Sequence, residues 1–594
     1  MKKPVVMLVA AMLAACTTSP PPRSPDAALF SLVEEYFERQ LELSPMNATS
    51  IGDSRYDDRL DDSTSLGFRE KAFGIERAFL DRARGIDAAK LSPASRITYD
   101  IFVSEREQAL EGQKFHEEYM PFNQMQGLPM DLAVYGSGTG PQPFVTAKDY
   151  DRFLKRVREF PRWADGAIAL MRTGISNGIT LPRVAMAKAA PQLREIGATA
   201  LKDNIFWAPI LAMPKEISAK DRQRLSEAYE AALTREVLPA YTRLADFFDH
   251  DYLPAARTTV GWSDLPDGRA WYRWRIRQST TMDMPAEEIH QLGLSEVARI
   301  RGEMLAVKEQ VGFKGDLDAF FQYVEEDPKF YFNSEGELLG AYRDVKRRVD
   351  ALLPKLFADF PKADYEIRPV EQFRAASAAG ASYQSPSADG KRPGIFYINT
   401  YNLKAQPRFG LETLSLHEAS PGHHFQISIQ QELTDLPRFR RFNGYVSYAE
   451  GWALYAESIG KELGMFTDPY QWYGRLADEM LRAMRLVVDT GLHAKGWTRE
   501  QSIKYMLENS SMAESDVISE VERYIVWPGQ ALGYKLGQLH ISALRAKAQA
   551  QLGEAFDVRD FHSQVLRDGS VPMDVLTAKI DRWIEAKRPA RAVK

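Results

Sequence analysis

Apolar residues recur at intervals of three and four along most of the chain, a spacing that places them on one face of a helix. The pattern is clear in DAALFSLVEEYFERQLEL from Asp26, in YDRFLKRVREFPRWADGAIALMRTGI from Tyr150 and in AEEIHQLGLSEVARIRGEMLAV from Ala286. It continues in ELLGAYRDVKRRVDALLPKLF from Glu337 and in most segments after Gly410. We therefore predict a mainly α protein.

The region from Pro361 to Tyr401 has a different pattern. Its apolar segments are short and β-like, namely YEIRPV, ASYQSP and GIFYINT, and glycine, serine and proline separate them. This pattern predicts a small antiparallel β-sheet just before a histidine-rich stretch.

The last of these segments is our candidate for an edge strand that pairs with an extended substrate. Such pairing uses backbone groups that every peptide carries. The candidate strand runs from Gly394 to Thr400, and the expected substrate contacts are Gly394, Tyr397 and Asn399. The alternative is a hairpin that only braces two helices.

Composition and charge are those of an ordinary globular protein. Of the 594 residues, 44% are hydrophobic and 26% charged, and the net charge is −5 with no basic run. A nucleic-acid partner is therefore not expected. We expect one helical body over residues 26–594, with an N-terminal half over 26–280 and a metal-binding half over 281–594. The sequence does not indicate an oligomeric state.

The N-terminus has the layout of a secretory signal. MKKPVVMLVAAMLAAC has two lysines, an apolar core and small residues before Cys16. Leu13-Ala14-Ala15-Cys16 resembles a bacterial lipobox, in which the cysteine is lipidated, and Cys16 is the only cysteine. We expect a signal peptide over residues 1–15, a Pro-rich tether over 16–25, and a body in the periplasm on a lipid anchor. Thr17 favours the outer membrane; the alternative is an ordinary secretion signal with an incidental cysteine.

The stretch LSLHEASPGHHFQ from Leu414 is the main candidate for chemistry. Zinc hydrolases carry H-E-x-x-H on a helix, but here Pro421 follows His417 by four, and histidines come at six and seven. On an unbroken helix six residues leave a side chain about 120° off the starting face, and seven move it about 10 Å along the axis. Neither spacing can chelate one ion.

Pro421 and Gly422 interrupt that helix, because proline lacks a backbone donor and glycine admits conformations closed to other residues. We predict a local bulge or turn that brings a later histidine back toward His417. His423 is the expected second ligand and His424 the runner-up. The alternative is a helix terminus whose histidines have capping and surface roles.

A third ligand is expected from the apolar, aromatic segment YVSYAEGWALYAE. Glu450, 33 residues after His417, is in reach of a helix that returns to the first, and a nearby cation would offset the burial of its carboxylate. Glu418, next to His417, fits the base that takes a proton from bound water. Glu457 lies on the face of Glu450 but two turns away, so we expect it to hydrogen-bond a ligand histidine.

The motif HEASPGHHFQ from His417, followed by EGWALYAE from Glu450, resembles the bacterial domain-of-unknown-function family 885, which has lipoprotein members. RLVVDTGLHAKGWT from Arg485 and PGQALGYKLG from Pro528 extend the resemblance to nearly all of the mature chain. The family looks like a distant member of the gluzincin-like zinc metallopeptidases. The resemblance implies a large helical body with a deep cleft, with His417, His423 and Glu450 as ligands and Glu418 as base.

Other groups could complete such a site. A donor aimed at the carbonyl oxygen would stabilise the charge that develops there, and the candidates are His493, Tyr524 and Tyr534. Each of these could instead be a packed residue with a satisfied polar group. Asp489, four residues before His493, could orient its ring. Arg485 and Arg523 could hold a substrate carboxylate, although charged helix faces supply many such arginines.

We therefore expect a zinc-dependent metallohydrolase that acts on short peptides in the periplasm. His, His and Glu ligands favour zinc over magnesium or calcium. One alternative is a lipid-anchored peptide-binding or envelope-assembly protein without catalysis. Another is a zinc amidase that acts on a cell-wall fragment or a modified amino acid.

Overall fold

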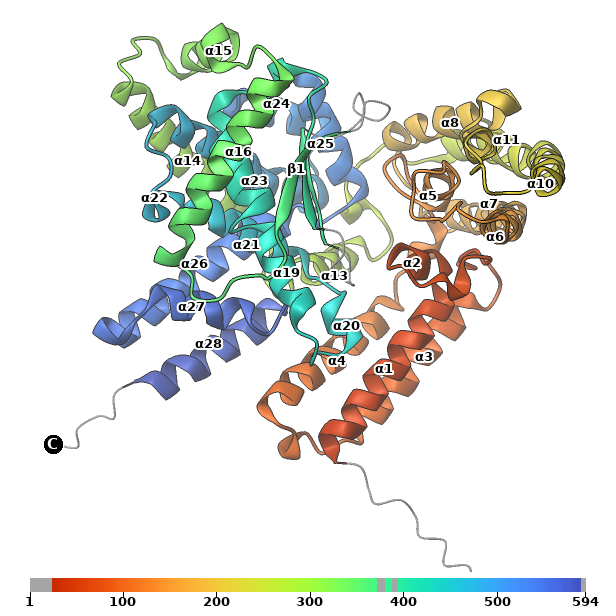
Figure 1. The fold of residues 1–594 in the computed structure, drawn as a ribbon, viewed down its shortest axis with the longest axis horizontal. Coiled ribbons are helices and arrows are strands. Elements are labelled where there is room, and N and C mark those ends of the chain that lie inside the picture. Colours follow the sequence, from red (N-terminus) through yellow and green to blue (C-terminus); the bar gives the residue numbers. More distant parts are fainter. Residues whose placement is uncertain (1–23, 371–379, 387–392, 589–594) are drawn as a thin grey trace, which may run out of the picture.

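A computed structural model describes residues 24–370, 380–386 and 393–588. The expected signal peptide and Cys16 lie outside the described residues. The chain is mainly α, as predicted, and one small sheet lies among the helices of the C-terminal half (Figure 1). Within the described residues, no helix is both long and apolar enough to cross a membrane.

The N-terminal half consists of helices. They are α1 (Pro25–Leu43), α2 (Pro45–Ser50), α3 (Phe68–Arg84), α4 (Pro93–Gly112), α5 (Leu128–Tyr135), α6 (Ala147–Val157), α7 (Phe160–Ser176), α8 (Arg183–Ala198), α9 (Ala208–Leu211), α10 (Ala219–Ala232), α11 (Leu238–Phe247), α12 (Leu253–Ala255) and α13 (Gly268–Thr280). The pattern from Tyr150 forms two helices, because Pro161 occupies the first turn of α7, where no backbone donor is required.

The C-terminal half carries the sheet and the longest helices. Its helices are α14 (Ala286–Gln310), α15 (Leu317–Glu326), α16 (Glu335–Leu352), α18 (Leu411–Leu414), α19 (His423–Glu432), α20 (Arg438–Arg441), α21 (Val446–Ser458), α22 (Gly460–Leu463), α23 (Pro469–Ala494), α24 (Arg499–Asn509), α25 (Glu514–Val526), α26 (Leu532–Leu552), α27 (Val558–Leu566) and α28 (Met573–Lys587).

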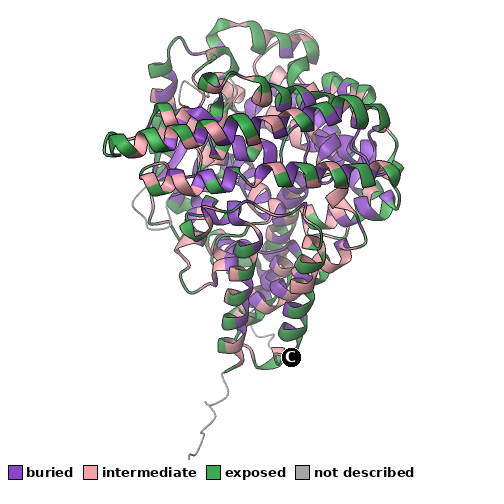
Figure 2. Cartoon of the chain, turned by 90° about the vertical axis from the view of Figure 1, so that its right-hand side faces the viewer, coloured by how far each residue is buried: buried purple, intermediate pink, exposed green. Residues whose placement is uncertain are grey.

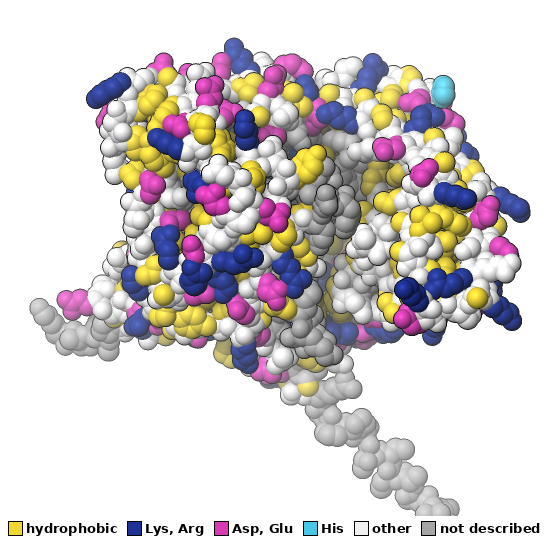
Figure 3. Space-filling model, turned by 45° about the horizontal axis from the view of Figure 1, so that its top comes forward, with side chains coloured by type: hydrophobic (Ala, Val, Ile, Leu, Met, Phe, Trp, Pro, Cys, Tyr) yellow, Lys and Arg dark blue, Asp and Glu magenta, His cyan; other side chains and the backbone are white. Residues whose placement is uncertain are grey.

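Two large apolar cores divide the N-terminal helices. One core contains buried residues from Met46 to Ala256, and its helices α5–α11 gather on the right of Figure 1. In a second core α1, α3 and α4 pack with α19, α21 and α26–α28 of the C-terminal half. In Figure 2 the buried residues lie toward the interior and the exposed residues lie on the outer face. Figure 3 shows the surface hollowed between the right-hand part of the molecule and the rest, with both signs of charge interspersed.

The sheet has the order β1-β3-β2, with β1 at Tyr365–Pro369, β2 at Ala381–Gln384 and β3 at Gly394–Ile398. All three strands lie where the pattern predicts them. The predicted antiparallel sheet is wrong in one pairing, because β1 runs parallel to β3 while β2 runs antiparallel to it. Alternation of apolar and polar residues indicates strands, but it does not show how strands that are not neighbours in sequence pair with one another.

The predicted edge strand is also wrong, because β3 is the central strand. Its backbone is paired on both sides, and the Asn399 N–H donates to the Gly380 carbonyl at 2.9 Å. The Tyr397 hydroxyl donates to the Gln384 side chain at 3.4 Å. Gly394 has a packing role instead, because a Cβ there would lie 2.6 Å from the Tyr383 hydroxyl. These residues therefore do not form a free edge, and β2 is the sheet edge that packs near α19.

Candidate metal centre

His417 lies in a π-helical turn, Ser415–Ala419, that continues α18. π-Helical turns are uncommon in proteins, and those that occur often lie at functional sites. The His417 side chain is buried, and Glu418 beside it is half-buried. The turn ends at Ser420, whose φ of −115° and ψ of 133° are extended rather than helical.

The predicted interruption is present between this turn and α19. The Ser420–Pro421 peptide bond is cis, and α19 begins at His423. Gly422 makes the close return possible, since a Cβ there would lie 1.9 Å from the His417 carbonyl oxygen. The Trp452 indole N–H donates to the Pro421 carbonyl at 2.8 Å and fixes the turn from α21.

The interruption brings His423 against His417. The two ring centroids are 4.8 Å apart and the rings are nearly perpendicular. Glu450 enters from α21, and its Oε2 lies 3.5 Å from Nε2 of each histidine. One donor atom from each of the three residues lies within 4.8 Å of the others, so these side chains could hold a metal ion.

The position of α21 depends on its contact with α26. Gly451 and Gly537 face each other, and a Cβ on Gly451 would lie 2.6 Å from the Gly537 backbone. A Cβ on Gly537 would lie 1.9 Å from the Ser447 carbonyl oxygen. The two helices therefore pack backbone to backbone next to the residue that supplies the carboxylate.

Glu457 hydrogen-bonds His417, as the helical spacing predicts. Its Oε1 accepts from Nδ1 of His417 at 2.7 Å, which leaves Nε2 to face Glu450. Burial lowers the pKa of His417, but the carboxylates of Glu450, Glu457 and Glu418 outweigh burial and raise that pKa to about 10. Burial raises the pKa of Glu457, and the contact with His417 opposes it.

The carboxylate of Glu450 is held in its charged form. Burial alone would raise its pKa, but the charge of His423 and the hydrogen bonds to both histidines lower it well below its usual value. The cluster therefore offers a carboxylate with two imidazoles around it, a donor set that suits a borderline-soft cation.

His424, the runner-up ligand, is engaged elsewhere. Its Nδ1 lies 2.8 Å from the Tyr383 hydroxyl and 3.3 Å from the Ser428 hydroxyl, and its ring packs on Tyr365. Burial lowers the pKa of His424 to about 4, so it is neutral at pH 7. Tyr383 is a neighbour that the sequence did not reveal, because β2 meets α19 only through the fold.

His493 is a structural histidine rather than a candidate donor. Its Nδ1 accepts the backbone N–H of Trp262 at 3.2 Å, and its Nε2 donates to the Tyr524 carbonyl at 2.9 Å. Burial lowers its pKa to about 3. Both ring nitrogens are therefore committed, and the predicted catalytic role of His493 is not supported.

Asp489 does not orient His493. Its Oδ1 accepts from the Tyr272 hydroxyl at 2.6 Å, and both its oxygens accept from the Gly529 N–H at 3.0 Å. Burial raises the pKa of Asp489 to about 7, although these two donors oppose the shift. The four-residue spacing placed the pair on one helix, but other segments provide the partners of each side chain.

Tyr524 and the two arginines form one buried network around Glu520. The Tyr524 hydroxyl donates to Glu520 and accepts from Nε of Arg485 at 3.1 Å. Arg485 and Arg523 contact the same carboxylate at 3.0 and 3.1 Å. The hydroxyl proton of Tyr524 is thus committed to Glu520, which argues against the predicted catalytic donor. Both arginines have an acidic partner, so recognition of a substrate carboxylate by them stays a prediction.

Tyr534 is the tyrosine electrostatically coupled to the cluster. Burial raises its pKa, the charge of Glu450 adds to the shift, and Arg485 and Arg523 oppose it. The guanidinium of Arg485 lies over its ring at 4.4 Å. Its role as a donor to substrate stays a prediction.

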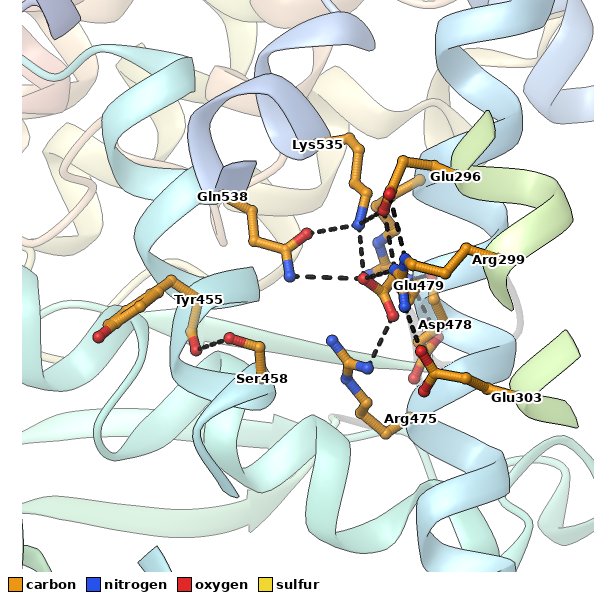
Figure 4. A network of polar contacts seen from close by, with 11 residues as sticks. Glu296, Arg299, Glu303, Tyr455, Ser458, Arg475, Asp478, Glu479, Lys535 and Gln538 are labelled. Carbon is orange, nitrogen blue, oxygen red and sulfur yellow. Dashed lines mark hydrogen bonds and ion pairs between the residues drawn. The ribbon is translucent and has the colours of Figure 1, made fainter. Parts of the chain in front are cut away.

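A charged network, buried at Lys535, Glu479 and Arg475, supports the helices around the cluster (Figure 4). Lys535 of α26, with no exposed surface, contacts Glu479 and lies 2.8 Å from Glu296. Arg475 and Arg299 reach Glu479 at 2.7 and 2.8 Å. Burial would raise the pKa of Glu479, but these three cations lower it to about 2. Since α26 also packs along α21, the network ties the helix of the candidate glutamate ligand to α14 and α23.

Fold and site together define a mainly helical protein with a His-His-Glu cluster at an interrupted helix. The chain belongs to the family described as "Bacterial protein of unknown function (DUF885)", which matches residues 45–580. The family that the sequence motifs indicate is thereby confirmed.

Two solved structures have the same fold over almost the whole chain. The "putative lipoprotein from Colwellia psychrerythraea" has a TM-score of 0.85 and 32% identity, and the match covers 95% of this chain and 100% of that one. The "putative lipoprotein of unknown function from Shewanella oneidensis" has a TM-score of 0.75 and 17% identity, covering 92% and 99%, and it supports the fold alone. No curated protein matches the chain.

Proposed function

We propose that this protein is a zinc-dependent metallohydrolase that cleaves an amide bond in short peptides, and that it is a distant gluzincin-like enzyme. The supporting observation is the cluster of His417, His423 and Glu450, whose donor atoms lie within 4.8 Å of one another. Two imidazoles and a carboxylate are a donor set of catalytic zinc sites, which keep a further position open for water.

In this proposal His417, His423 and Glu450 would hold the ion. Zinc, when bound, would polarise the substrate carbonyl and lower the pKa of a coordinated water. Glu418 follows His417 directly, and we assign it the proton from that water and later delivery of the proton to the leaving amine. Glu457 keeps the His417 ring in the orientation that turns Nε2 toward Glu450. Tyr534 would donate to the oxygen on which negative charge develops.

The proposal extends to localisation. The Colwellia protein is named a putative lipoprotein, and this chain carries a lipobox-like Leu13-Ala14-Ala15-Cys16. We propose a lipid anchor at Cys16 that holds the body at the cell envelope, facing the periplasm and attached to the outer membrane. Mass spectrometry of the mature N-terminus tests this, because an unmodified Cys16 would refute the anchor.

The decisive experiment compares Glu418→Gln with the wild type after zinc loading. The variant should bind one zinc per chain but lose cleavage of a mixed short-peptide library by more than about 100-fold, as expected for loss of a general base. Glu309→Gln, an exposed glutamate of α14, is the matched control and should cleave normally. Undiminished cleavage by Glu418→Gln would refute the mechanism. Absence of stoichiometric zinc in the wild type would favour a binding protein without catalysis.

A further inference from the structure

Tyr534 lies on the part of α26 that packs against the start of α21. A Cβ on Gly533 would lie 3.2 Å from the Ser447 backbone nitrogen, and Ser447 is one helical turn before Glu450. Burial raises the pKa of Tyr534, and among the charged groups Glu450 has the largest effect on that pKa. The Tyr534 side chain is partly exposed, whereas that of Tyr524 is fully buried. Tyr534 is therefore close to the candidate glutamate ligand without being sealed in the interior.

Arg485 holds the ring of Tyr534. Its guanidinium lies 4.4 Å from the ring centroid, and Nη2 of the same guanidinium lies 3.0 Å from the Glu520 carboxylate. A cation fixed over the face of an aromatic ring attracts that ring. This contact sets the position of the ring but leaves the direction of the hydroxyl proton undetermined.

Arg523 sets the orientation of the Gln530 side-chain amide. Nη1 of Arg523 donates to Oε1 of Gln530 at 2.7 Å, and its Nε and Nη2 donate to Glu520 at 3.3 and 3.1 Å. A guanidinium has donors and no acceptor, so only the amide oxygen of Gln530 can face it. Nε2 of Gln530 must therefore point away from Arg523.

The nitrogen side of Gln530 meets the hydroxyl of Tyr534. The two residues are four apart, and the Gly533 N–H closes the turn between them by donating to the Gln530 carbonyl at 3.3 Å. The Gln530 side chain hydrogen-bonds Tyr534, and this contact opposes the rise in pKa that burial and Glu450 cause. A neutral partner lowers the pKa of an acid by donating to its charged form, so the phenol oxygen is the acceptor.

The proton of the Tyr534 hydroxyl is therefore not used by Gln530. Tyr524 differs, because its hydroxyl donates to Glu520. Within the described part of the chain, Gln530 is the one hydrogen-bond partner of the Tyr534 hydroxyl, and it takes the oxygen rather than the proton.

We propose that Gln530 is a positioning residue that directs the Tyr534 hydroxyl proton to the substrate oxygen on which negative charge develops. Arg523, held by Glu520, keeps the amide of Gln530 in the orientation that this requires. The inference rests on the proposed hydrolase function, in which Tyr534 is the donor to that oxygen.

Gln530→Glu separates positioning from packing. The new carboxylate has the same shape and still accepts from Arg523, but it has no N–H and would accept the proton of Tyr534. On the best-cleaved peptide of the short-peptide library, kcat should fall about 100-fold, as in Tyr534→Phe, with KM and zinc content within about twofold of wild type. A residue that only packs would leave kcat unchanged, and that result would overturn the proposal.

The double variant Gln530→Glu, Tyr534→Phe excludes a direct effect of the new charge. Its kcat should equal that of Tyr534→Phe alone within about twofold, because no hydroxyl proton remains to be redirected. A further tenfold fall would mean that the carboxylate acts on the site by itself, which would refute positioning through Tyr534. Gln310→Glu, at the exposed end of α14, is the matched control and should cleave like the wild type.

A binding measurement makes the test independent of turnover. The probe is N-phosphorylalanylalanine, whose phosphoryl oxygens carry negative charge like a tetrahedral intermediate, titrated calorimetrically into the zinc-loaded protein. Gln530→Glu and Tyr534→Phe should each weaken its binding at least tenfold.

The outcomes separate this inference from the proposed function. Weakened probe binding in both variants, with no peptide cleavage by the wild type, would support the positioning role and refute the hydrolase. Cleavage by the wild type with an unchanged kcat in Gln530→Glu would do the reverse. Neither cleavage nor probe binding by the zinc-loaded wild type would refute both.

Discussion

Nδ1 of His417 and Oε1 of Glu457 lie 2.7 Å apart in the interior of the protein. The contact joins the π-helical turn to α21, and it decides which nitrogen of the ring is turned toward Glu450. A buried carboxylate in this position both orients the imidazole and makes it a better electron donor.

Replacing Glu457 by glutamine should therefore weaken zinc binding without removing a ligand. Glutamine keeps the shape and an acceptor oxygen for His417 but loses the charge. We expect about 10- to 100-fold weaker zinc affinity, measured by competition with a chelator of known affinity. Glu309→Gln is again the control, and an unchanged affinity in Glu457→Gln would show that the charge is not used.

His423 and His424 form a matched pair for testing the ligand assignment. His423→Ala should abolish stoichiometric zinc binding, because it removes one of the three clustered donors. His424→Ala should keep zinc and lower the melting temperature, because it removes the contacts with Tyr383 and Ser428. Metal analysis and thermal unfolding separate the two effects. The reverse pattern of zinc content would make His424 the ligand.

Gly422→Ala tests whether the interruption depends on close backbone approach. The added Cβ would lie 1.9 Å from the His417 carbonyl, so the turn must open, and we expect a loss of about 1–3 kcal/mol in unfolding free energy. Zinc binding should weaken with it. Gly302→Ala on α14 has open space around its Cβ and should gain about 0.5–1 kcal/mol through helix propensity. Denaturant titration measures both, and equal effects in the two variants would contradict the geometry.

The raised pKa of Asp489 should make the free energy of unfolding depend on pH. Its pKa rises from 3.8 to about 7 on folding, so between these values the native state binds a proton that the unfolded state has lost. The stabilisation that this proton provides is complete below pH 3.8 and is lost as the pH rises to about 7. Over this range the free energy of unfolding falls by up to about 1.4 kcal/mol per pH unit.

Asp489→Asn mimics the neutral acid and should remove this contribution. The variant should be more stable than the wild type at pH 7.5, and the difference should shrink toward pH 4.5. Urea unfolding at several pH values gives the comparison. A difference that stays constant across this range would mean that Asp489 is charged in the fold at all of these pH values.

The local chemistry of the site could be predicted from sequence, and its distant contacts could not. Pro421 and Gly422 are sufficient to indicate an interrupted helix, and the choice of His423 as the partner of His417 agrees with the observed cluster. The spacing of Glu450 and Glu457 places both on one face of α21, where each meets His417.

The errors have one cause, which is that partners come from segments far away in the chain. His493 and Asp489 share a helix, but Trp262, Tyr272 and Gly529 occupy their polar atoms. The position of β3 just before the histidine stretch led us to predict an edge strand, yet two other strands enclose it. Periodicity describes a segment by itself and contains no information on which segment will lie against it.

The contact between Gly451 and Gly537 has a consequence for anyone who transplants this centre into another scaffold. Gly451 and Gly537, which have no side chains, set the distance between α21 and α26. They thereby set the position of the Glu450 carboxylate relative to the two imidazoles. A graft that copies the three ligands but places alanines at these two positions would force the helices apart. The carboxylate would then lie too far from the two imidazoles to share an ion with them.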